Sequence, residues 1–322
     1  SKESLEKYRL MAKQMNIVNG ENDNRFTSKP EIEIKDYIRN LGLECRKNRK
    51  ILEGKELDIY IASKKLAIEF NGLKWHTEWF GHKGQFIHLQ KTEECAEKGV
   101  KLLQIFEDEY VLKREIVLSK IRHILGKDDG TKVFGRKCEV REIPAAEAMR
   151  FLDGFHIQGS TTATSHYGAY FEGKLIAAMS FLKEKGKEWN LVRFASDYHY
   201  RCVGIAGKLL DCFKNENNPD KIKTFADRRW TPIAENNLYT KLGFALDDIV
   251  KPDYCYYNPY VDRYQRFHKF GFRKEVLMRK HPEFSDAMTE TEMARALGYD
   301  RIWNCGLFRY VWTKENKDNE GK

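Results

Sequence analysis

The chain has 322 residues, of which 41% are hydrophobic, and 57 Lys and Arg against 48 Asp and Glu give a formal charge of +9. This length corresponds to about two domains of roughly 150 residues, and the apolar content excludes a disordered chain. The basic balance fits a polyanionic partner such as nucleic acid, although other classes of protein share it.

The sequence predicts neither a membrane helix nor a secretion signal. Its longest apolar stretches, such as residues 175–179, are far shorter than the roughly 18 residues that a bilayer requires, and its N-terminus is charged and polar. The seven cysteines are odd in number and include no CxxC pair, which argues against a disulfide framework and a thiolate zinc site. We therefore expect a cytoplasmic protein with free thiols and no membrane partner.

The N-terminal part of the chain begins with a predicted polar helix over residues 1–20, which the Asn- and Asp-rich run at 19–24 ends. Thr27 or Ser28 can cap the next helix, and Pro30 suits its first turn. The further elements expected here are strands near 50–61 and 65–71, a helix at 85–98, a buried strand at 100–106, a helix to about 125 and a linker at 126–130.

Two carboxylates are predicted to lie side by side in neighbouring strands. Asp58 and Glu69 are eleven residues apart, which fits two paired strands joined by a tight turn. Glu31 shares the apolar face of the helix that begins near residue 28, where a carboxylate is costly without a partner. Such oxygen ligands suit Mg²⁺, which can activate a water molecule. We therefore predict a metal site at Asp58, Glu69 and Glu31.

The same region resembles the PD-(D/E)XK nuclease superfamily, in particular its very-short-patch-repair and phage homing-endonuclease branch with the EDxHD pattern. The motifs that carry the resemblance are Leu57-Asp58-Ile-Tyr-Ile61, Ala67-Ile-Glu69-Phe-Asn71-Gly72 and Trp75-His76, and residues 99–109 continue it. The resemblance covers about residues 25–125. It implies a restriction-endonuclease-like α/β domain, Mg²⁺ or Mn²⁺ as cofactor, double-stranded DNA as substrate and phosphodiester hydrolysis.

By this resemblance Asp58 is the metal-binding aspartate, Glu69 belongs to the E-x-K element and Glu31 is the helix glutamate. Asn71 stands where the family usually has lysine, which puts the activating role of that position in doubt. Lys91 is then the candidate for a migrated ammonium group.

Two histidines complete the set that the resemblance implies. His76 matches the histidine of this branch and is a candidate general acid or base. His88 lies where the repair enzymes carry a second acidic residue. The predicted catalytic residues are Glu31, Asp58, Glu69, His76, Lys91 and His88.

A different pattern follows the linker. Two alternating strands are joined by a Glu172-Gly173 turn, and a later strand leads into a glycine-bearing turn and a helix. A capping box at Thr289 and Glu292 predicts a short helix near the C-terminus. The other elements expected are strands at 167–171, 175–182, 188–197, 223–226 and 307–312, with helices at 204–215 and 234–241.

A second motif, Arg201-Cys-Val-Gly204-Ile-Ala206-Gly207, lies between a predicted strand and a predicted helix. Free N–H groups at a helix N-terminus bind phosphate. With the hairpin at 167–181 and the run Leu238-Tyr239-Thr-Lys-Leu-Gly243-Phe244, the motif resembles the GNAT acyltransferase superfamily over about residues 140–250, and less specifically Mom-like DNA-modification proteins. The resemblance implies a mixed-sheet domain and an acetyl-CoA site at Arg201, Gly204, Ala206 and Gly207.

No catalytic base stands out in this second region. Asp227, Tyr239 and His156 are all candidates. The domain either transfers an acyl group or is a retained fold used for binding, because fold alone does not determine function.

Residues 251–280 carry eight Lys or Arg against three Asp or Glu, with five Tyr and three Phe among them. Cations can contact phosphates while aromatic rings stack on bases. An aromatic core with a solvated basic face explains the same pattern. The residues predicted to bind DNA are Arg228, Arg229, Arg263, Arg266, Lys269, Arg273 and Lys274.

The sequence thus predicts a four-part chain. The parts are an N-terminal helical extension (1–24), a nuclease domain (25–128), a GNAT-like domain (129–250) and a basic aromatic segment that completes the second domain (251–322). The leading hypothesis is a Mg²⁺-dependent, site-specific endonuclease of phage homing type whose second half holds DNA. The alternatives are an acetyl-CoA-dependent acyltransferase that modifies nucleic acid and a non-catalytic DNA-binding module.

Overall fold

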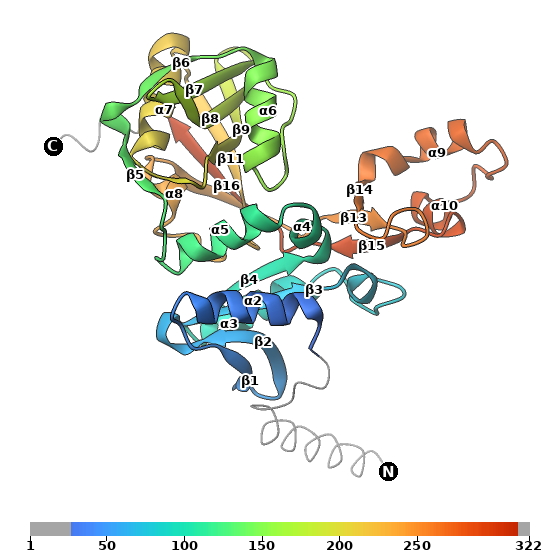
Figure 1. Ribbon diagram of the computed structural model, residues 1–322. Coiled ribbons are helices and arrows are strands. Elements are labelled where there is room, and N and C mark those ends of the chain that lie inside the picture. Colours follow the sequence, from blue (N-terminus) through green and yellow to red (C-terminus); the bar gives the residue numbers. More distant parts are fainter. Residues whose placement is uncertain (1–26, 315–322) are drawn as a thin grey trace. The chain divides into compact units, whose positions relative to one another are not determined.

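The computed structural model describes residues 27–314, so the helix expected at residues 1–20 lies outside the described part of the chain. The protein is of the mixed α/β class and forms two compact units (Figure 1). Unit 1 comprises residues up to Leu112 together with Arg228–Pro232 and Lys251–Gly306. Unit 2 comprises Lys113–Asp227, Ile233–Val250 and the chain from Leu307 onward. The expected boundary near residues 126–130 and the assignment of residues 251–306 to the second domain therefore need correction.

Unit 1 contains a four-stranded sheet of order β1-β2-β3-β4. Its central strand β3 is buried along its whole length, which is typical of a strand covered on both faces. The strands are β1 (Arg46–Leu52), β2 (Lys55–Ile61), β3 (Leu66–Asn71) and β4 (Lys101–Phe106), and only β3 and β4 pair in parallel.

Two helices accompany this sheet and begin for different reasons. Helix α2 (Lys29–Asn40) starts with the expected Pro30 and a capping box between Ser28 and Glu31. Helix α3 (Ile87–Glu97) lies between β3 and β4 and forms the crossover that a parallel pair requires. Short 3₁₀ turns, η1 (Ala62–Lys64) and η2 (Leu73–His76), and helix α4 (Glu107–Leu112) complete this part.

The remainder of unit 1 is a three-stranded sheet of order β14-β13-β15 with two short helices. Its core contains Tyr256, Phe272, Leu277 and Met293, so much of the aromatic content of residues 251–280 is core. The elements are β13 (Tyr254–Tyr257), β14 (Arg266–His268), η4 (Lys269–Phe272), α9 (Lys274–Lys280), α10 (Glu290–Ala296) and β15 (Asp300–Trp303). Helix α10 begins with the predicted Thr289–Glu292 capping box.

Unit 2 is built on a seven-stranded sheet of order β12-β16-β11-β9-β8-β7-β6. Every neighbouring pair is antiparallel except β9 and β11. The strands are β6 (Glu139–Glu142), β7 (Ser165–Phe171), β8 (Lys174–Lys183), β9 (Glu188–Ser196), β11 (Lys221–Asp227), β12 (Ala245–Val250) and β16 (Leu307–Thr313). Strands β5 (Thr131–Phe134) and β10 (Tyr200–Val203) form a separate parallel pair.

Helices α6 (Ala145–Phe155) and α7 (Ile205–Asn217) cover opposite faces of this sheet (Figure 1). The reason is the alternation of side chains along β8: Ala177 packs in the cluster that contains Phe213 of α7, whereas Ala178 packs with Leu152 of α6. Helices α5 (Arg114–Ile124) and α8 (Leu238–Lys241) also belong to unit 2. No helix in the described residues is long and apolar enough to cross a membrane, and all seven cysteines are free thiols.

Candidate functional site

The predicted carboxylates of unit 1 do lie together, but they are already bonded to protein. The Asp58 backbone N–H donates to Glu69 Oε1 (3.1 Å), and the Phe70 N–H donates to Asp58 Oδ2 (3.0 Å). Lys91 forms an ion pair with Glu69. One oxygen of Glu31 accepts from the Ser28 cap (2.8 Å to Ser28 Oγ), and its other oxygen is buried without a hydrogen bond.

Electrostatics at this cluster favour a proton on Asp58. Burial raises the pKa of Asp58 well above its ordinary value, and the neighbouring carboxylates of Glu69 and Glu31 raise it further. Within residues 27–314, no group of three or more His, Cys, Asp or Glu side chains is arranged to hold a metal ion. The structure therefore brings the three carboxylates together without forming the predicted metal site.

His76 and His88 form a stacked pair, with 2.7 Å between His76 Nδ1 and His88 Nε2. His88 Nδ1 lies 2.8 Å from the Trp303 carbonyl oxygen, so His88 donates from Nδ1 and accepts at Nε2 from His76. Burial lowers the pKa of both, and that of His88 falls to about 3. The two rings are consequently a neutral hydrogen-bonded pair in unit 1.

Three of the arginines predicted to bind DNA are held inside unit 1. Arg229 Nη1 lies 2.7 Å from Glu109 Oε1, and Arg266 bonds both Asp108 (2.8 Å) and Glu109 (3.1 Å). Arg228, whose side chain is also buried, pairs with Glu93 at 3.0 Å. Each guanidinium thus has a carboxylate partner within the protein, and the predicted contact of these arginines with DNA stays a prediction.

The other four predicted DNA-binding cations lie nearer the surface. Arg263 and Arg273 are exposed, Lys269 pairs with Asp253 (2.6 Å) and Lys274 pairs with Asp286 (2.9 Å). Their predicted contact with DNA stays a prediction.

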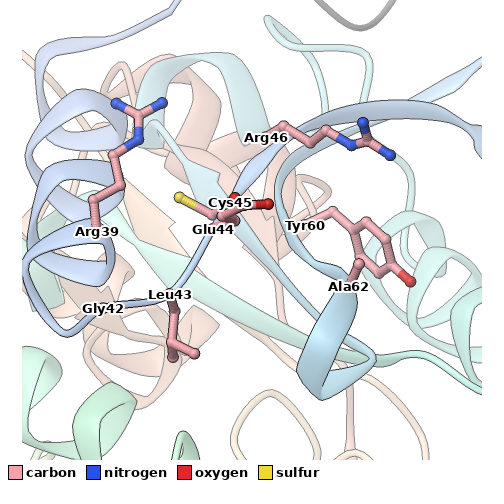
Figure 2. Close-up of a pocket in the computed structure, with 8 residues that line it drawn as sticks. All are labelled: Arg39, Gly42, Leu43, Glu44, Cys45, Arg46, Tyr60 and Ala62. Atoms are coloured by element: carbon pink, nitrogen blue, oxygen red, sulfur yellow. The ribbon is translucent and has the colours of Figure 1, made fainter.

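Unit 1 also has a surface pocket of about 520 Å³, which sequence reasoning did not identify (Figure 2). In Figure 2 the Arg39 and Arg46 side chains flank it, with Cys45 between them. Arg39 pairs with Asp36 at 3.0 Å, and burial raises the pKa of the Cys45 thiol. A protonated thiol is a poor nucleophile. The lining residues are Arg39, Gly42, Leu43, Glu44, Cys45, Arg46, Tyr60 and Ala62.

The most open part of the unit 2 sheet lies between its two parallel strands. Strands β9 and β11 pair only from Lys221 opposite Glu188 to Thr224 opposite Leu191, although both strands continue for several residues. Val192 is an extra residue in the register of β9 with β8, and such a bulge bends a strand and increases its twist. The carboxyl halves of the two strands therefore diverge, which leaves backbone groups of β9 unpaired on its β11 side.

Tyr239 of α8 lies where the strands separate. Thr224, the last paired residue of β11, donates from its hydroxyl to the Leu191 carbonyl oxygen (2.9 Å) and interacts with the Tyr239 side chain. Burial raises the pKa of Tyr239 to about 12, so its phenol keeps its proton at neutral pH. Tyr239 also stacks on Tyr310, with 5.2 Å between ring centroids.

The predicted phosphate motif forms the N-terminus of α7. Gly204 is the N-cap, with φ of +75°, a left-handed conformation that glycine adopts without strain. No side chain caps this 13-residue helix, and a Cβ added at Gly204 would meet nothing within 4 Å. The first N–H groups of the helix, including that of Ala206, are therefore available to an anion.

Cations surround this helix terminus. Arg201 of β10 pairs in register with Lys132 of β5, and the turn that follows β5 brings Gly135 against Gly204. Four cations in these segments are exposed, and none has a carboxylate partner within the described residues: Lys132, Arg136, Lys137 and Arg201. This arrangement favours a ligand with several negative charges.

The candidate base His156 is poorly arranged for that role. Its Nδ1 accepts from the Gln158 N–H (3.1 Å), so the neutral ring carries its proton on Nε2 and its lone pair is occupied. Burial, and after it the nearby Arg193 guanidinium, lower the pKa of His156 to about 3. Sequence reasoning missed Arg193 and the bulge at Val192, because neither glycine nor proline marks the bulge.

No family model matches the chain, and no curated protein matches it. Solved structures to which it is similar include a GNAT family acetyltransferase from Elizabethkingia anophelis with acetyl-CoA bound, at 14% identity over 55% of this chain and 98% of that one, with a TM-score of 0.32. A Bacillus subtilis acetyltransferase in complex with CoA aligns at 15% identity over 55% and 99%, with a TM-score of 0.33. The Escherichia coli ribosomal-protein-S18-alanine N-acetyltransferase aligns at 12% identity over 55% and 93%, with a TM-score of 0.32.

These comparisons correct the leading hypothesis. The solved structures named above are acetyltransferases, and no nuclease is among them. The predicted endodeoxyribonuclease activity is corrected accordingly, while a PD-(D/E)XK homing-endonuclease domain, a phage origin and Mg²⁺ have no support in these findings.

Proposed function

We propose that unit 2 is an acyl-CoA-dependent acyltransferase and that unit 1 binds nucleic acid, double-stranded DNA first of all. The observation that carries the first part is the separation of β9 and β11 after Leu191 and Thr224. Ligands of sheets with parallel strands bind at the carboxyl ends of those strands, where a crevice opens. The uncapped terminus of α7 at Gly204 follows this end of β9 along the chain.

The residues present fit acetyl-CoA. Its phosphates need hydrogen-bond donors, and its amide-containing arm needs the unpaired edge of a strand. Gly204 leaves the helix terminus open, and Arg136 and Arg201 supply positive charge beside it. Among the described residues, the pairing of β9 with β11 ends at Leu191, so the β9 backbone beyond Val192 can pair with amides.

When bound, an acyl-CoA thioester supplies an activated acyl group. Transfer breaks a C–S bond, forms a bond to an acceptor nitrogen or oxygen, and moves one proton from the acceptor to sulfur. Tyr239 is the residue that we assign to proton donation, because its phenol is protonated at neutral pH and lies at the strand opening beside Thr224. Asp227 lies at the carboxyl end of β11. No described contact gives it a part in acyl transfer, and we assign it no role.

Nucleic acid is proposed as the macromolecular partner of unit 1. Trp75 and Trp79 are 64% and 67% exposed, which is unusual for rings of this size. The Lys74 ammonium lies over the Trp75 ring at 5.4 Å, and Arg295 lies over Trp79 at 5.9 Å. Exposed rings next to cations suit stacking on bases together with contact to phosphates.

The test of acyl transfer measures the release of free CoA thiol from acetyl-CoA, with duplex DNA, RNA and a pool of small amines as acceptors. We expect thiol release that depends on an acceptor, and we expect Tyr239→Phe to lower the turnover number by about 10²- to 10⁴-fold, the usual contribution of a general acid. Tyr264→Phe in unit 1 is the matched control. Acceptor-dependent release that Tyr239→Phe leaves unchanged would remove Tyr239 from the mechanism.

A further inference from the structure

Arg193 of β9 has surroundings that set it apart from the ion-paired arginines. It is the first residue after the bulge at Val192 and pairs in register with Ser180 of β8. Its Nε donates to the Gly159 carbonyl oxygen (3.0 Å), and its Nη1 donates to the Val192 carbonyl oxygen (2.7 Å). Three of its five N–H groups therefore have no acceptor in residues 27–314.

No carboxylate compensates the charge of Arg193 among the described residues. Asp153, an acid near the same loop, has its Oδ1 bonded to the Ser160 N–H (2.7 Å). Lys113 and Lys120 also lie near His156 and add positive charge. Arg193 is half-buried and has no counter-ion in the described part of the chain, so its remaining N–H groups are available to an anionic ligand.

A second donor lies on the loop that Arg193 contacts. Gly159 donates its N–H to the His156 carbonyl oxygen (2.9 Å), which joins His156 to the same short loop. The His156 ring carries its proton on Nε2, because Nδ1 accepts from Gln158. This Nε2–H has no acceptor within the described residues.

We propose that Arg193, assisted by the His156 Nε2–H, binds an anionic group of the acyl acceptor, a phosphate or a carboxylate. This inference rests on the proposed acyltransferase function and names the acceptor class, an amine or hydroxyl compound that carries such a group. Arg193 then selects the acceptor, while Gly204 and the α7 terminus serve the acyl donor.

Binding of the anion also changes His156. Burial is the first cause that lowers the His156 pKa, and the Arg193 charge is the next. An anion beside Arg193 offsets that charge and raises the pKa of His156 toward its ordinary range.

The experiment uses the full chain and titrates inorganic phosphate and acetate into Gly204→Glu protein, in which the α7 terminus is blocked. Binding is measured by calorimetry at low salt. We expect at least one of the two anions to bind, and we expect Arg193→Gln in the same background to weaken that binding at least tenfold. Arg193→Lys should restore part of the loss, and Arg141→Gln is the matched exposed control. Circular dichroism checks that each variant is folded.

Tighter binding of phosphate indicates a phosphate-bearing acceptor, and tighter binding of acetate indicates a carboxylate; either result supports the proposal. Failure of both anions to bind, or equal binding by Arg193→Gln, overturns it. A separate titration of wild-type protein with acetyl-CoA tests the proposed function. A failure of the anion-binding proposal can therefore be distinguished from a failure of the proposed acyltransferase function, because the anion titration needs no acyl donor.

Discussion

Arg229 and Arg266 of unit 1 and Arg193 and Arg201 of unit 2 carry the same charge in different surroundings. The first two lie against Glu109, within 3.1 Å of its carboxylate. Neither Arg193 nor Arg201 has an ion-pair partner among the described residues. The first two stabilise a fold, and the second two are available to a ligand.

The difference shows that the local density of positive charge in a sequence does not locate a binding surface. Residues 251–280 hold the densest basic run, yet Arg266 is neutralised by carboxylates almost 160 positions away along the chain. Arg201 lies in a less basic stretch and faces solvent. The presence or absence of a nearby carboxylate decides which cation can bind an anion.

The largest effect is expected from breaking the buried network of unit 1. Arg266→Met leaves Asp108 without its ion-pair partner and Glu109 with one partner fewer. Uncompensated buried charge of this kind lowers the free energy of unfolding by about 3–5 kcal/mol. Urea unfolding measures the loss. Arg263→Met, three residues away and exposed, should cost far less. Equal losses in the two variants would show that Arg266 is not a structural arginine.

A smaller effect is expected from the exposed cations near Gly204. Arg136→Gln and Arg201→Gln should each weaken acetyl-CoA binding about two- to fivefold at low salt, the range typical of solvent-exposed charge pairs. The loss should shrink as salt is added, because exposed charges are screened. Arg46→Gln in unit 1 should leave the affinity unchanged. A loss of affinity that does not depend on salt would show that Arg136 and Arg201 do not contact the charges of acetyl-CoA directly.

The smallest effect is expected at Asp58, a group that opposes folding when it is ionised. Its folded-state pKa is raised, so its contribution to stability is present below the unfolded-state pKa and is lost as pH rises through the folded-state pKa. Asp58→Asn should therefore remain more stable than wild type at pH 8 and lose this advantage near pH 4. Urea unfolding at both pH values checks this, with Asp36→Asn on α2 as the exposed control. An advantage that is independent of pH would contradict the raised pKa.

Local features of the chain could be predicted from its sequence. The capping boxes at Ser28 and Thr289 mark real helix starts, and the glycine at position 204 ends a strand and begins a helix. Each of these depends on residues only a few positions apart, so the sequence pattern contains the information.

Features that depend on distant residues could not be predicted. The register of β9 with β8 creates the bulge at Val192, and no residue type marks it. Arg229 looked like a surface cation because its partner Glu109 is 120 positions away. The segment at 251–306 joins unit 1 because its Tyr257 and Ile302 pack in one cluster with Leu73 and Phe106, whereas sequence order alone assigned it to the neighbouring domain.

An acyl-CoA site formed by the opening beside β9 and the terminus of α7 is the basis of the proposed function, and titration calorimetry with acetyl-CoA tests for this site. Wild-type protein should bind one acetyl-CoA, and Gly204→Glu should weaken binding at least about 100-fold, because it places a carboxylate at a terminus that attracts phosphate. Gly173→Glu is the matched control: Gly173 has φ of +77° and, like Gly204, no atom within 4 Å of an added Cβ, but it lies in the turn between β7 and β8. Binding by wild type that is lost only in Gly204→Glu is the predicted result. Absence of binding by wild type, or equal loss in both variants, would contradict the account.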